Sequence, residues 1–266
     1  MRFLQSSIFI LSTTLIFAAQ AEEIKVIDNC TSTKEYITTQ GYLKDKKEYS
    51  LDDKKIAEVA TIVSGGCTGA ASRFIQTMNF LVDAEVPANQ ALVYSKTIAL
   101  EEDVIFNNFI SIFKKIYVEK YFDLTTAKSL KMASELTAKM DREPKVVLED
   151  FNTLSDFCMN EKELDLGYDR CADFVLKTLV NSKNVKVSIG KNSLEFFDFL
   201  VRDQQGPKIS TLKALEEIEK VSPYGIIGYL NYKEAFVFAS SEKGMNLKND
   251  EAMKFSYDMA SKTIKK

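Results

Sequence analysis

Apolar residues recur at intervals of three and four along most of the chain, which is the spacing of one face of an α-helix. Residues 67–82 and residues 105–121 follow this pattern most clearly. Both stretches therefore predict amphipathic helices. The same spacing predicts further helices at about residues 125–140, 145–159, 166–181, 193–202, 210–221 and 250–264.

Two stretches depart from the helical spacing. In residues 185–189 the apolar side chains alternate with Lys186 and Ser188, as they would in a short strand. Residues 226–238 contain Gly228 and a run of aromatic and β-branched side chains. The two stretches could pair as a small β element, but we favour a loop for the first and a helix for the second.

The predicted helices recur with a period near 40 residues. An apolar residue precedes a helix at six places, and the residue six positions after each of them is also apolar. This period is typical of HEAT and armadillo repeats, although no family consensus is visible. The six anchors are Leu51, Val86, Leu124, Leu166, Ile209 and Leu247, separated by 35, 38, 42, 43 and 38 residues.

Phenylalanine divides the repeat into two unlike helices. Of the 18 phenylalanines, three lie in the first 21 residues, and 12 of the remaining 15 fall in the second halves of the units. The first halves are rich in Ala, Leu and Met instead. This division predicts stacked hairpins in which the Phe-rich helix is sandwiched between neighbouring units. We therefore expect an all-α fold, a short α-solenoid of stacked helical hairpins. The alternative is an irregular helical bundle with a minor β element.

The chain begins like an exported protein. Arg2 provides a positive start, residues 3–18 are mainly apolar, and Ala19 and Ala21 are the small residues that a signal peptidase recognises. We expect cleavage before Glu22. The alternative is an uncleaved membrane anchor, but the apolar stretch is short for a bilayer span of about 20 residues.

Three segments follow from this reading of the sequence. Residues 1–21 are predicted to be a signal peptide, residues 22–50 a polar leader without helical period, and residues 51–266 a single helical-repeat domain. No second apolar segment of this kind follows, so we expect no transmembrane segment after cleavage. The predicted location is the periplasm or the cell exterior.

All four cysteines lie in the exported part, and an even number in an oxidising compartment favours disulfides. We prefer the pairs Cys158–Cys171 and Cys30–Cys67, because the first pair is close in sequence and the second would tie the leader to the first helices. A zinc site is the competing interpretation. No two cysteines have the CxxC spacing that such a site favours, so we expect no metal.

Composition excludes several classes of function. The chain has no histidine, so it cannot form a Ser-His-Asp triad, a Cys-His pair or a histidine-bearing zinc site. The formal charge is −3 and Lys and Arg form no long run, which argues against nucleic acid as a partner. Nothing in the sequence calls for a cofactor.

Carboxylates and tyrosines are the remaining candidate chemistry. The carboxylates cluster where helices are expected to begin, which the helix dipole explains without catalysis. The densest group of tyrosines could grip an extended peptide or a sugar chain, or it could pack half-buried between the last two hairpins. The acidic groups are Glu101 to Asp103, Glu216, Glu217 and Glu219, and Asp165 with Asp169; the tyrosines are Tyr224, Tyr229 and Tyr232.

We therefore expect an exported, non-enzymatic protein that binds a protein or peptide of the cell envelope, because stacked hairpins present long surfaces. The alternative is a hydrolase that acts on cell-wall glycan or peptide through two carboxylates. A third possibility is a small-molecule carrier with a Phe-lined cavity. The sequence does not specify an oligomeric state.

Overall fold

The computed structural model describes residues 32–137, 143–160, 164, 166–182 and 184–262. Within these ranges the chain is helical and contains no strand. Residues 184–189 form a loop and Gly225–Ser240 is a helix, so the minor β element is absent from the described part of the chain. The all-α prediction is confirmed.

The α-helices follow one another with short connections. Short irregular turns extend three of the segments: a 3-10 turn at Lys47–Tyr49, a π-helical turn at Lys114–Val118 and a 3-10 turn at Ser222–Tyr224. The α-helices are α1 Thr33–Asp45, α2 Asp53–Ser64, α3 Ala70–Asp83, α4 Ala88–Ala99, α5 Asp103–Phe113, α6 Thr126–Thr137, α7 Pro144–Cys158, α8 Tyr168–Asn181, α9 Gly190–Val201, α10 Thr211–Val221, α11 Gly225–Ser240 and α12 Asn249–Ser261.

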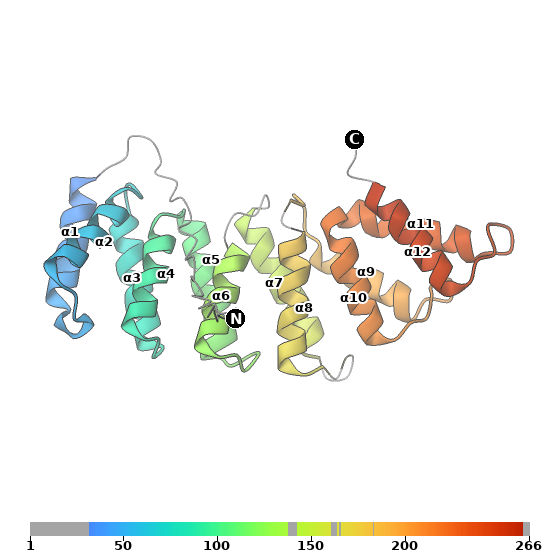
Figure 1. Ribbon diagram of the computed structural model, residues 1–266, viewed down its shortest axis with the longest axis horizontal. Coiled ribbons are helices and arrows are strands. Elements are labelled where there is room, and N and C mark those ends of the chain that lie inside the picture. The colour runs from blue at the N-terminus through green and yellow to red at the C-terminus, as the bar shows by residue number, and fades with distance from the viewer. Residues whose placement is uncertain (1–31, 138–142, 161–163, 165, 183, 263–266) are drawn as a thin grey trace, which may run out of the picture.

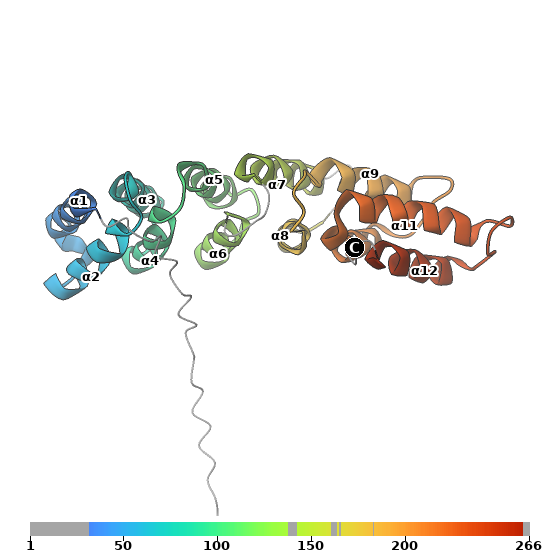
Figure 2. The same cartoon turned by 90° about the horizontal axis from the view of Figure 1, so that it is seen from above.

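The helices form an elongated stack of two layers (Figure 1). Seen from above, α1, α3, α5, α7, α9 and α11 line one side of the stack, which we call the odd layer, and the even-numbered helices line the other (Figure 2). The helix axes also turn along the stack, because α1, α3 and α5 are seen end-on in this view whereas α9 and α11 are seen from the side. The protein is a short α-solenoid.

Each odd helix packs more extensively against the even helix that follows it than against the one that precedes it. The hairpins are therefore α1–α2, α3–α4 and so on to α11–α12. The Phe-rich helix is the first of its hairpin, whereas the sequence period had suggested the second. The 12 phenylalanines that the sequence grouped together all lie in the odd layer, in α3, α5, α7, α9 and α11.

The first hairpin explains why the Phe-rich helix is the first of its hairpin and not the second. Residues 22–50 were expected to be a polar leader without helical period, but α1 and a 3-10 turn occupy Thr33–Asp45 and Lys47–Tyr49. Helix α1 buries Glu35, Thr39 and Leu43 against α2 and α3. Two of these three side chains are polar, so α1 carries almost no apolar signal in the sequence. Residues 22–31 lie outside the described residues.

The core of the odd layer is built from ring contacts. Phe109 is fully buried, with its ring stacked on Tyr94 of α4 and on Phe113 of the same helix. The ring of Phe196 in α9 lies 4.8 Å from that of Tyr229 and 5.1 Å from that of Tyr232 in α11. These phenyl rings fill the interior between helices. Burial of such large apolar side chains is the main force that holds neighbouring hairpins together.

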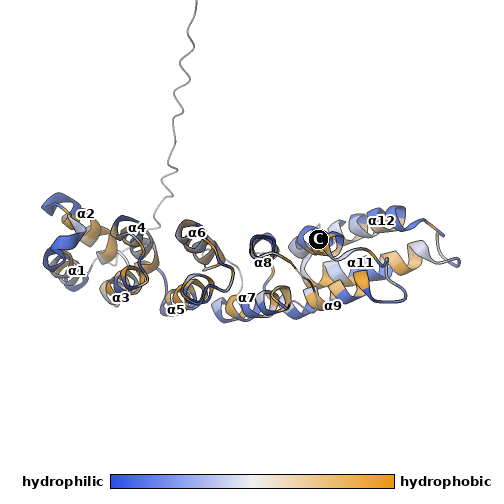
Figure 3. Ribbon diagram, turned by 90° about the horizontal axis from the view of Figure 1, so that it is seen from below, coloured by the Kyte–Doolittle hydropathy of each residue, from blue (hydrophilic) through white to orange (hydrophobic). Residues whose placement is uncertain are grey.

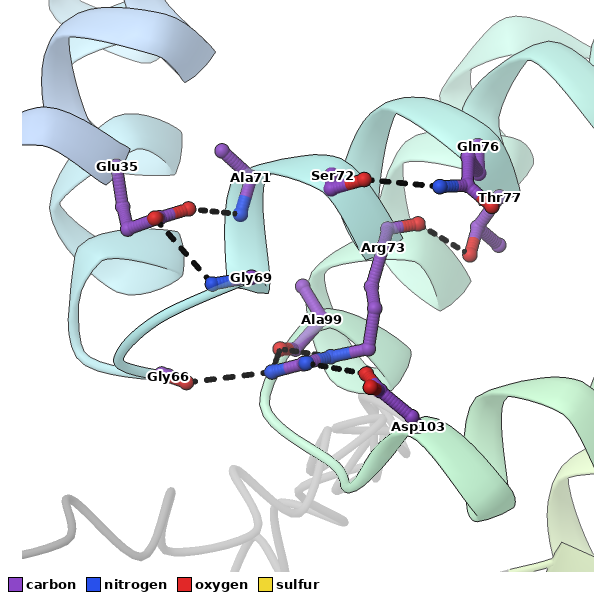
Figure 4. Close-up of polar contacts among 10 residues, drawn as sticks. All are labelled: Glu35, Gly66, Gly69, Ala71, Ser72, Arg73, Gln76, Thr77, Ala99 and Asp103. Carbon is purple, nitrogen blue, oxygen red and sulfur yellow. Dashed lines mark hydrogen bonds and ion pairs between the residues drawn. The ribbon is translucent and has the colours of Figure 1, made fainter.

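Buried polar side chains join each odd helix to the next, and Figure 4 shows the first two of these joints. The Glu35 carboxylate of α1 accepts hydrogen bonds from the backbone amides of Gly69 and Ala71, at 3.3 and 2.7 Å, where α3 begins. The Arg73 guanidinium of α3 donates to the carbonyl of Ala99 and pairs with Asp103 at 2.8 Å, where α5 begins. The first joint pairs amides that the backbone of α3 leaves unpaired at its start, and the second joins a carbonyl at the end of α4 to a side chain at the start of α5.

The later joints use other groups for the same task. Asn108 of α5 donates its side-chain amide to the carbonyl of Pro144, the first residue of α7. Asp150 of α7 accepts from the amide of Gly190 at 2.7 Å, where α9 begins. Ser193 of α9 shares a hydrogen bond of 2.9 Å with the hydroxyl of Tyr229 in α11.

Ion pairs link neighbouring even helices, and two of the three are exposed whereas Arg170–Glu219 is partly buried. The pairs are Lys128–Asp169 at 3.0 Å, Arg170–Glu219 at 2.8 Å and Lys213–Asp250 at 2.9 Å. Exposed pairs of this kind each contribute little to stability. The odd layer therefore carries most of the cohesion of the stack.

One disulfide joins the helices of the fourth hairpin. Cys158 at the end of α7 is bonded to Cys171 in α8, with 5.6 Å between their Cα atoms, which is the predicted pair. Cys67 is also disulfide-bonded, and the described residues contain no free cysteine. Cys30 lies outside the described residues, so the pair Cys30–Cys67 stays a prediction.

Candidate interaction surface

The tyrosines singled out in the sequence lie mostly inside the last two hairpins. Tyr229 and Tyr232 are 2% and 0% exposed, with their rings against Phe196. The hydroxyl of Tyr232 donates to Glu217 of α10 at 3.4 Å. Burial first, and then the charge and hydrogen bond of Glu217, raise the pKa of Tyr232 well above its usual range. These two rings are packing residues and do not form a surface that could grip a ligand.

Tyr224 occupies a different position, at the start of the last hairpin. It is half-buried, and its hydroxyl lies 3.3 Å from that of Tyr257 in α12. This hydrogen bond, followed by burial, raises the pKa of Tyr224 to about 12. The pair ties α12 to the turn before α11. The structure therefore agrees with packing between the last hairpins, which was the other interpretation of this cluster.

The helix that carries two of these tyrosines has an unusual composition. Of its 16 residues only Lys233 and Glu234 are charged, so apolar side chains lie on every side of α11. Gly225 begins the helix with a φ of +62°, in a region that side-chain-bearing residues rarely adopt. A helix that is apolar all round is normally covered on all sides. In this chain α9, α10 and α12 contact α11 but leave one side open.

Large apolar side chains occupy the open side of α11. Ile227, Leu230 and Phe238 are 54%, 48% and 56% exposed, and we call these three residues the α11 stripe. At about 100° per residue they lie nearly opposite the side that α11 turns to α9. The stripe is thus the face on which a further helix of the odd layer would pack.

An open groove of about 610 Å³ adjoins the stripe, between the end of α9 and the second half of α11. We call it the C-terminal groove. It combines apolar and charged groups, as recognition surfaces for peptides do. Its lining includes Phe199, Asp203, Lys233, Glu234, Val237 and Phe238.

The groups of the groove are held by local contacts. The Nζ atom of Lys233 lies 5.8 Å from the centre of the Phe199 ring, in the range of a cation–π contact. Asp203 accepts a hydrogen bond of 2.8 Å from the amide of Gln205, which fixes the loop after α9. The loop after α11 folds back, because the amide of Met245 donates to the carbonyl of Phe238. Met245, 44% exposed, therefore lies near one end of the stripe.

The opposite end of the stack has a different character. On the open side of α1 the exposed residues are mainly polar, including Lys34, Thr38 and Lys44, with Ile37 as the one large apolar side chain. Figure 3 shows the contrast, with orange segments along α11 and a mostly blue and white α1. Terminal repeats of solenoids normally carry such a polar outer face. The N-terminal end follows this rule and the C-terminal hairpin departs from it.

Four carboxylates of the acidic clusters predicted from the sequence are used in ion pairs. Asp103 pairs with Arg73, Glu219 with Arg170, Glu217 with Lys220 and Asp169 with Lys128. They are spread along the stack from α3 to α10, although Glu217 and Glu219 both lie in α10. Asp165 lies outside the described residues. The part of the chain that the structure describes holds no group of three or more acidic or cysteine side chains placed to bind a metal ion.

Comparison of the chain with protein-family models, curated proteins and solved structures found no match. None of the described helices is both long and apolar enough to cross a membrane. The class of protein is therefore defined by the fold alone, an α-solenoid with an apolar stripe and groove at its C-terminal hairpin.

The exposed large side chains of α11 are not the tyrosines that the sequence singled out. Ile227 lies two residues before Tyr229, and Leu230 lies two residues before Tyr232. Because α11 is apolar on all sides, its sequence has no period that distinguishes the covered side from the open one. The signal that identifies the surface is the lack of a polar face in a helix at the end of a stack.

Proposed function

We propose that the protein is an exported, non-enzymatic binding protein that engages a protein or peptide partner in the cell envelope. The observation that carries this proposal is the α11 stripe, a row of large apolar side chains left open beside the C-terminal groove. Exposed apolar patches of this kind mark interaction sites on otherwise soluble domains. The disulfide between Cys158 and Cys171 is compatible with an oxidising compartment outside the cytoplasm.

A macromolecular partner fits this surface better than the other two candidates. Asp103, Glu217 and Glu219 belong to the acidic clusters that a hydrolase would use, and all three are engaged in ion pairs. Catalysis would require two carboxylates across one cleft, and Asp103 lies in a different hairpin from the other two. The phenyl rings that a carrier would need around its ligand pack on one another in the odd layer. An open groove with both apolar and charged side chains is typical of surfaces that bind peptides.

Affinity capture with a matched pair of variants tests the proposal. The oxidised protein, its Phe238→Asp variant and its Ile37→Asp variant are each immobilised and exposed to the envelope fraction of the source cells. Phe238 and Ile37 are 56% and 61% exposed, so neither substitution opens the core. We expect a stoichiometric protein partner on the wild type and on Ile37→Asp, and its loss on Phe238→Asp.

The same beads are assayed for the release of cell-wall fragments. Release without a stoichiometric partner would contradict the proposal and favour the hydrolase. A partner that binds equally to all three proteins would place recognition away from the α11 stripe.

A further inference from the structure

The position of the α11 stripe within the stack defines what can cover it. Each earlier odd helix has the next odd helix on its C-terminal side: Phe199 of α9, for example, lies edge-on to Phe236 of α11, with ring centres 5.9 Å apart. Helix α11 is the last odd helix of the stack (Figure 2) and has no such neighbour among the described residues. Its stripe lies on the side away from α9. The interface between α9 and α11 therefore serves as a template for the missing contact.

We propose that the partner supplies an amphipathic helix with basic residues beside its apolar face, and that this helix packs on α11 as one more helix of the odd layer. This inference rests on the proposed function, because it specifies the partner of the same surface. Recognition would use the helix-in-groove mode, in which apolar anchors at helical spacing provide most of the affinity.

The spacing of the stripe sets the length of the partner helix. Ile227 and Phe238 are eleven residues apart on one helix, so they are about 16 Å apart along its axis. A helix of three turns or more is needed to contact both ends. An extended peptide would reach the same residues but would leave its backbone groups unpaired against an apolar row, which is unfavourable.

The charge of the surface sets the chemistry of the partner. Glu234 lies on the exposed side of α11 between Leu230 and Phe238, and it has no ion pair among the described residues. Asp203 adds a second exposed carboxylate at the groove. Lys233 turns toward Phe199 instead of toward the stripe. A partner with Lys or Arg beside its apolar face would neutralise Glu234 as the surface becomes buried, whereas an acidic partner would be repelled.

The same charge disfavours a second copy of this chain. A head-to-tail contact would place the polar open side of α1 on the stripe, with Ile37 as its one large apolar residue. A two-fold contact between antiparallel α11 helices would bring the Glu234 carboxylates of two copies close to the symmetry axis, where they repel. A lipid surface is disfavoured because insertion of the stripe would remove Glu234 from water without a counter-charge.

Three synthetic peptides test the inference directly. The first is an 18-residue amphipathic helix with Leu on one face and Lys on its flanks, the second has Glu in place of Lys, and the third is a scramble of the first. Their binding to the oxidised protein is measured by fluorescence anisotropy, in parallel with Phe238→Asp, Glu234→Lys and Ile37→Asp. Circular dichroism checks that every variant is folded.

We expect the Lys peptide to bind the wild type and Ile37→Asp equally, and Phe238→Asp at least about tenfold more weakly, as for an anchor residue of an interface. Glu234→Lys should reverse the preference, so that the Glu peptide binds more tightly than the Lys peptide. Equal binding of the scramble, or an unchanged preference in Glu234→Lys, would overturn the inference.

Two further measurements separate this inference from the proposed function. Self-association that Phe238→Asp abolishes, measured by sedimentation, would assign the stripe to a second copy. Binding to anionic phospholipid vesicles that Phe238→Asp abolishes would assign it to a membrane. If an envelope protein is captured through Phe238 but the peptides show no charge preference, the helix inference fails and the proposed function stands. If no partner depends on Phe238, both fail.

Discussion

Asp150 of α7 has no exposed surface, yet it bonds to the start of α9, forty residues further along the chain. Its carboxylate accepts hydrogen bonds from the hydroxyl of Ser188 at 2.6 Å and from the amides of Ile189 and Gly190 at 3.1 and 2.7 Å. Gly190 is required for this approach, because a Cβ atom at that position would lie 2.9 Å from the carboxylate. The start of α9 is thus capped by a side chain from another helix.

Replacement of Asp150 by Ala should destabilise the protein by roughly 2–4 kcal/mol, because it leaves buried amide groups without a partner. Chemical denaturation followed by circular dichroism measures the change in the free energy of unfolding. The control is Asp198→Ala, which removes an exposed carboxylate paired with Arg202 one turn later and should cost about 0.5 kcal/mol or less. Equal effects of the two substitutions would mean that the cap does not stabilise α9.

At the scale of the element, the odd helices differ from the even ones in the size of the side chains they bury. Phe109 lies at the centre of α5 with no exposed surface, between the rings of Tyr94 and Phe113. Phe238 belongs to the same layer, but its ring is 56% exposed. The two residues have the same side chain in opposite environments. They are therefore a matched pair for testing how much a buried ring of the odd layer contributes to the free energy of unfolding.

Phe109→Ala should cost about 3–5 kcal/mol, because the lost ring leaves a cavity in the odd layer. Phe238→Ala should change the free energy of unfolding by less than about 1 kcal/mol, as for other surface substitutions. Equilibrium denaturation of both variants checks this difference. A negligible effect of Phe109→Ala would show that the ring contacts of the odd layer contribute little.

The helical period and the grouping of phenylalanine sufficed to predict the stack, because both are determined by which side of each helix is buried. The same reasoning missed α1, since Glu35 and Thr39 are buried as polar residues and leave no apolar period. It also could not tell the covered side of α11 from the open one, because this helix has no polar face. The buried joints could not be predicted from the sequence, because they depend on contacts between residues about forty positions apart.

At the scale of the whole molecule, the stack is quasi-one-dimensional, since each hairpin contacts only its neighbours along most of its length. The disulfide between Cys158 and Cys171 crosses the fourth hairpin, near the middle of this line. It restricts the separation of α7 from α8 and thereby limits local opening where the stack has neighbours on both sides.

The double variant Cys158→Ala/Cys171→Ala should therefore be less stable by about 3 kcal/mol, the value expected for a loop of this length. Amide hydrogen exchange should increase in α7 and α8 more than in α2 to α4, because the effect is local in a solenoid. Mass spectrometry of the oxidised wild type provides the control, with all four cysteines paired and Cys30 linked to Cys67. Free thiols in the native protein would contradict the proposed pairing.

The joints of the odd layer also have a consequence for assembly. Their chemistry differs from one to the next: a carboxylate caps α3, a guanidinium holds the start of α5, an amide holds the start of α7, a second carboxylate caps α9, and a hydroxyl pair links α9 to α11. A hairpin docked beside the wrong neighbour would bury a group that finds no match, at a cost of about 1–3 kcal/mol each time. The order of the hairpins is thus encoded in their contacts as well as in the chain, which disfavours the docking of similar hairpins in the wrong order.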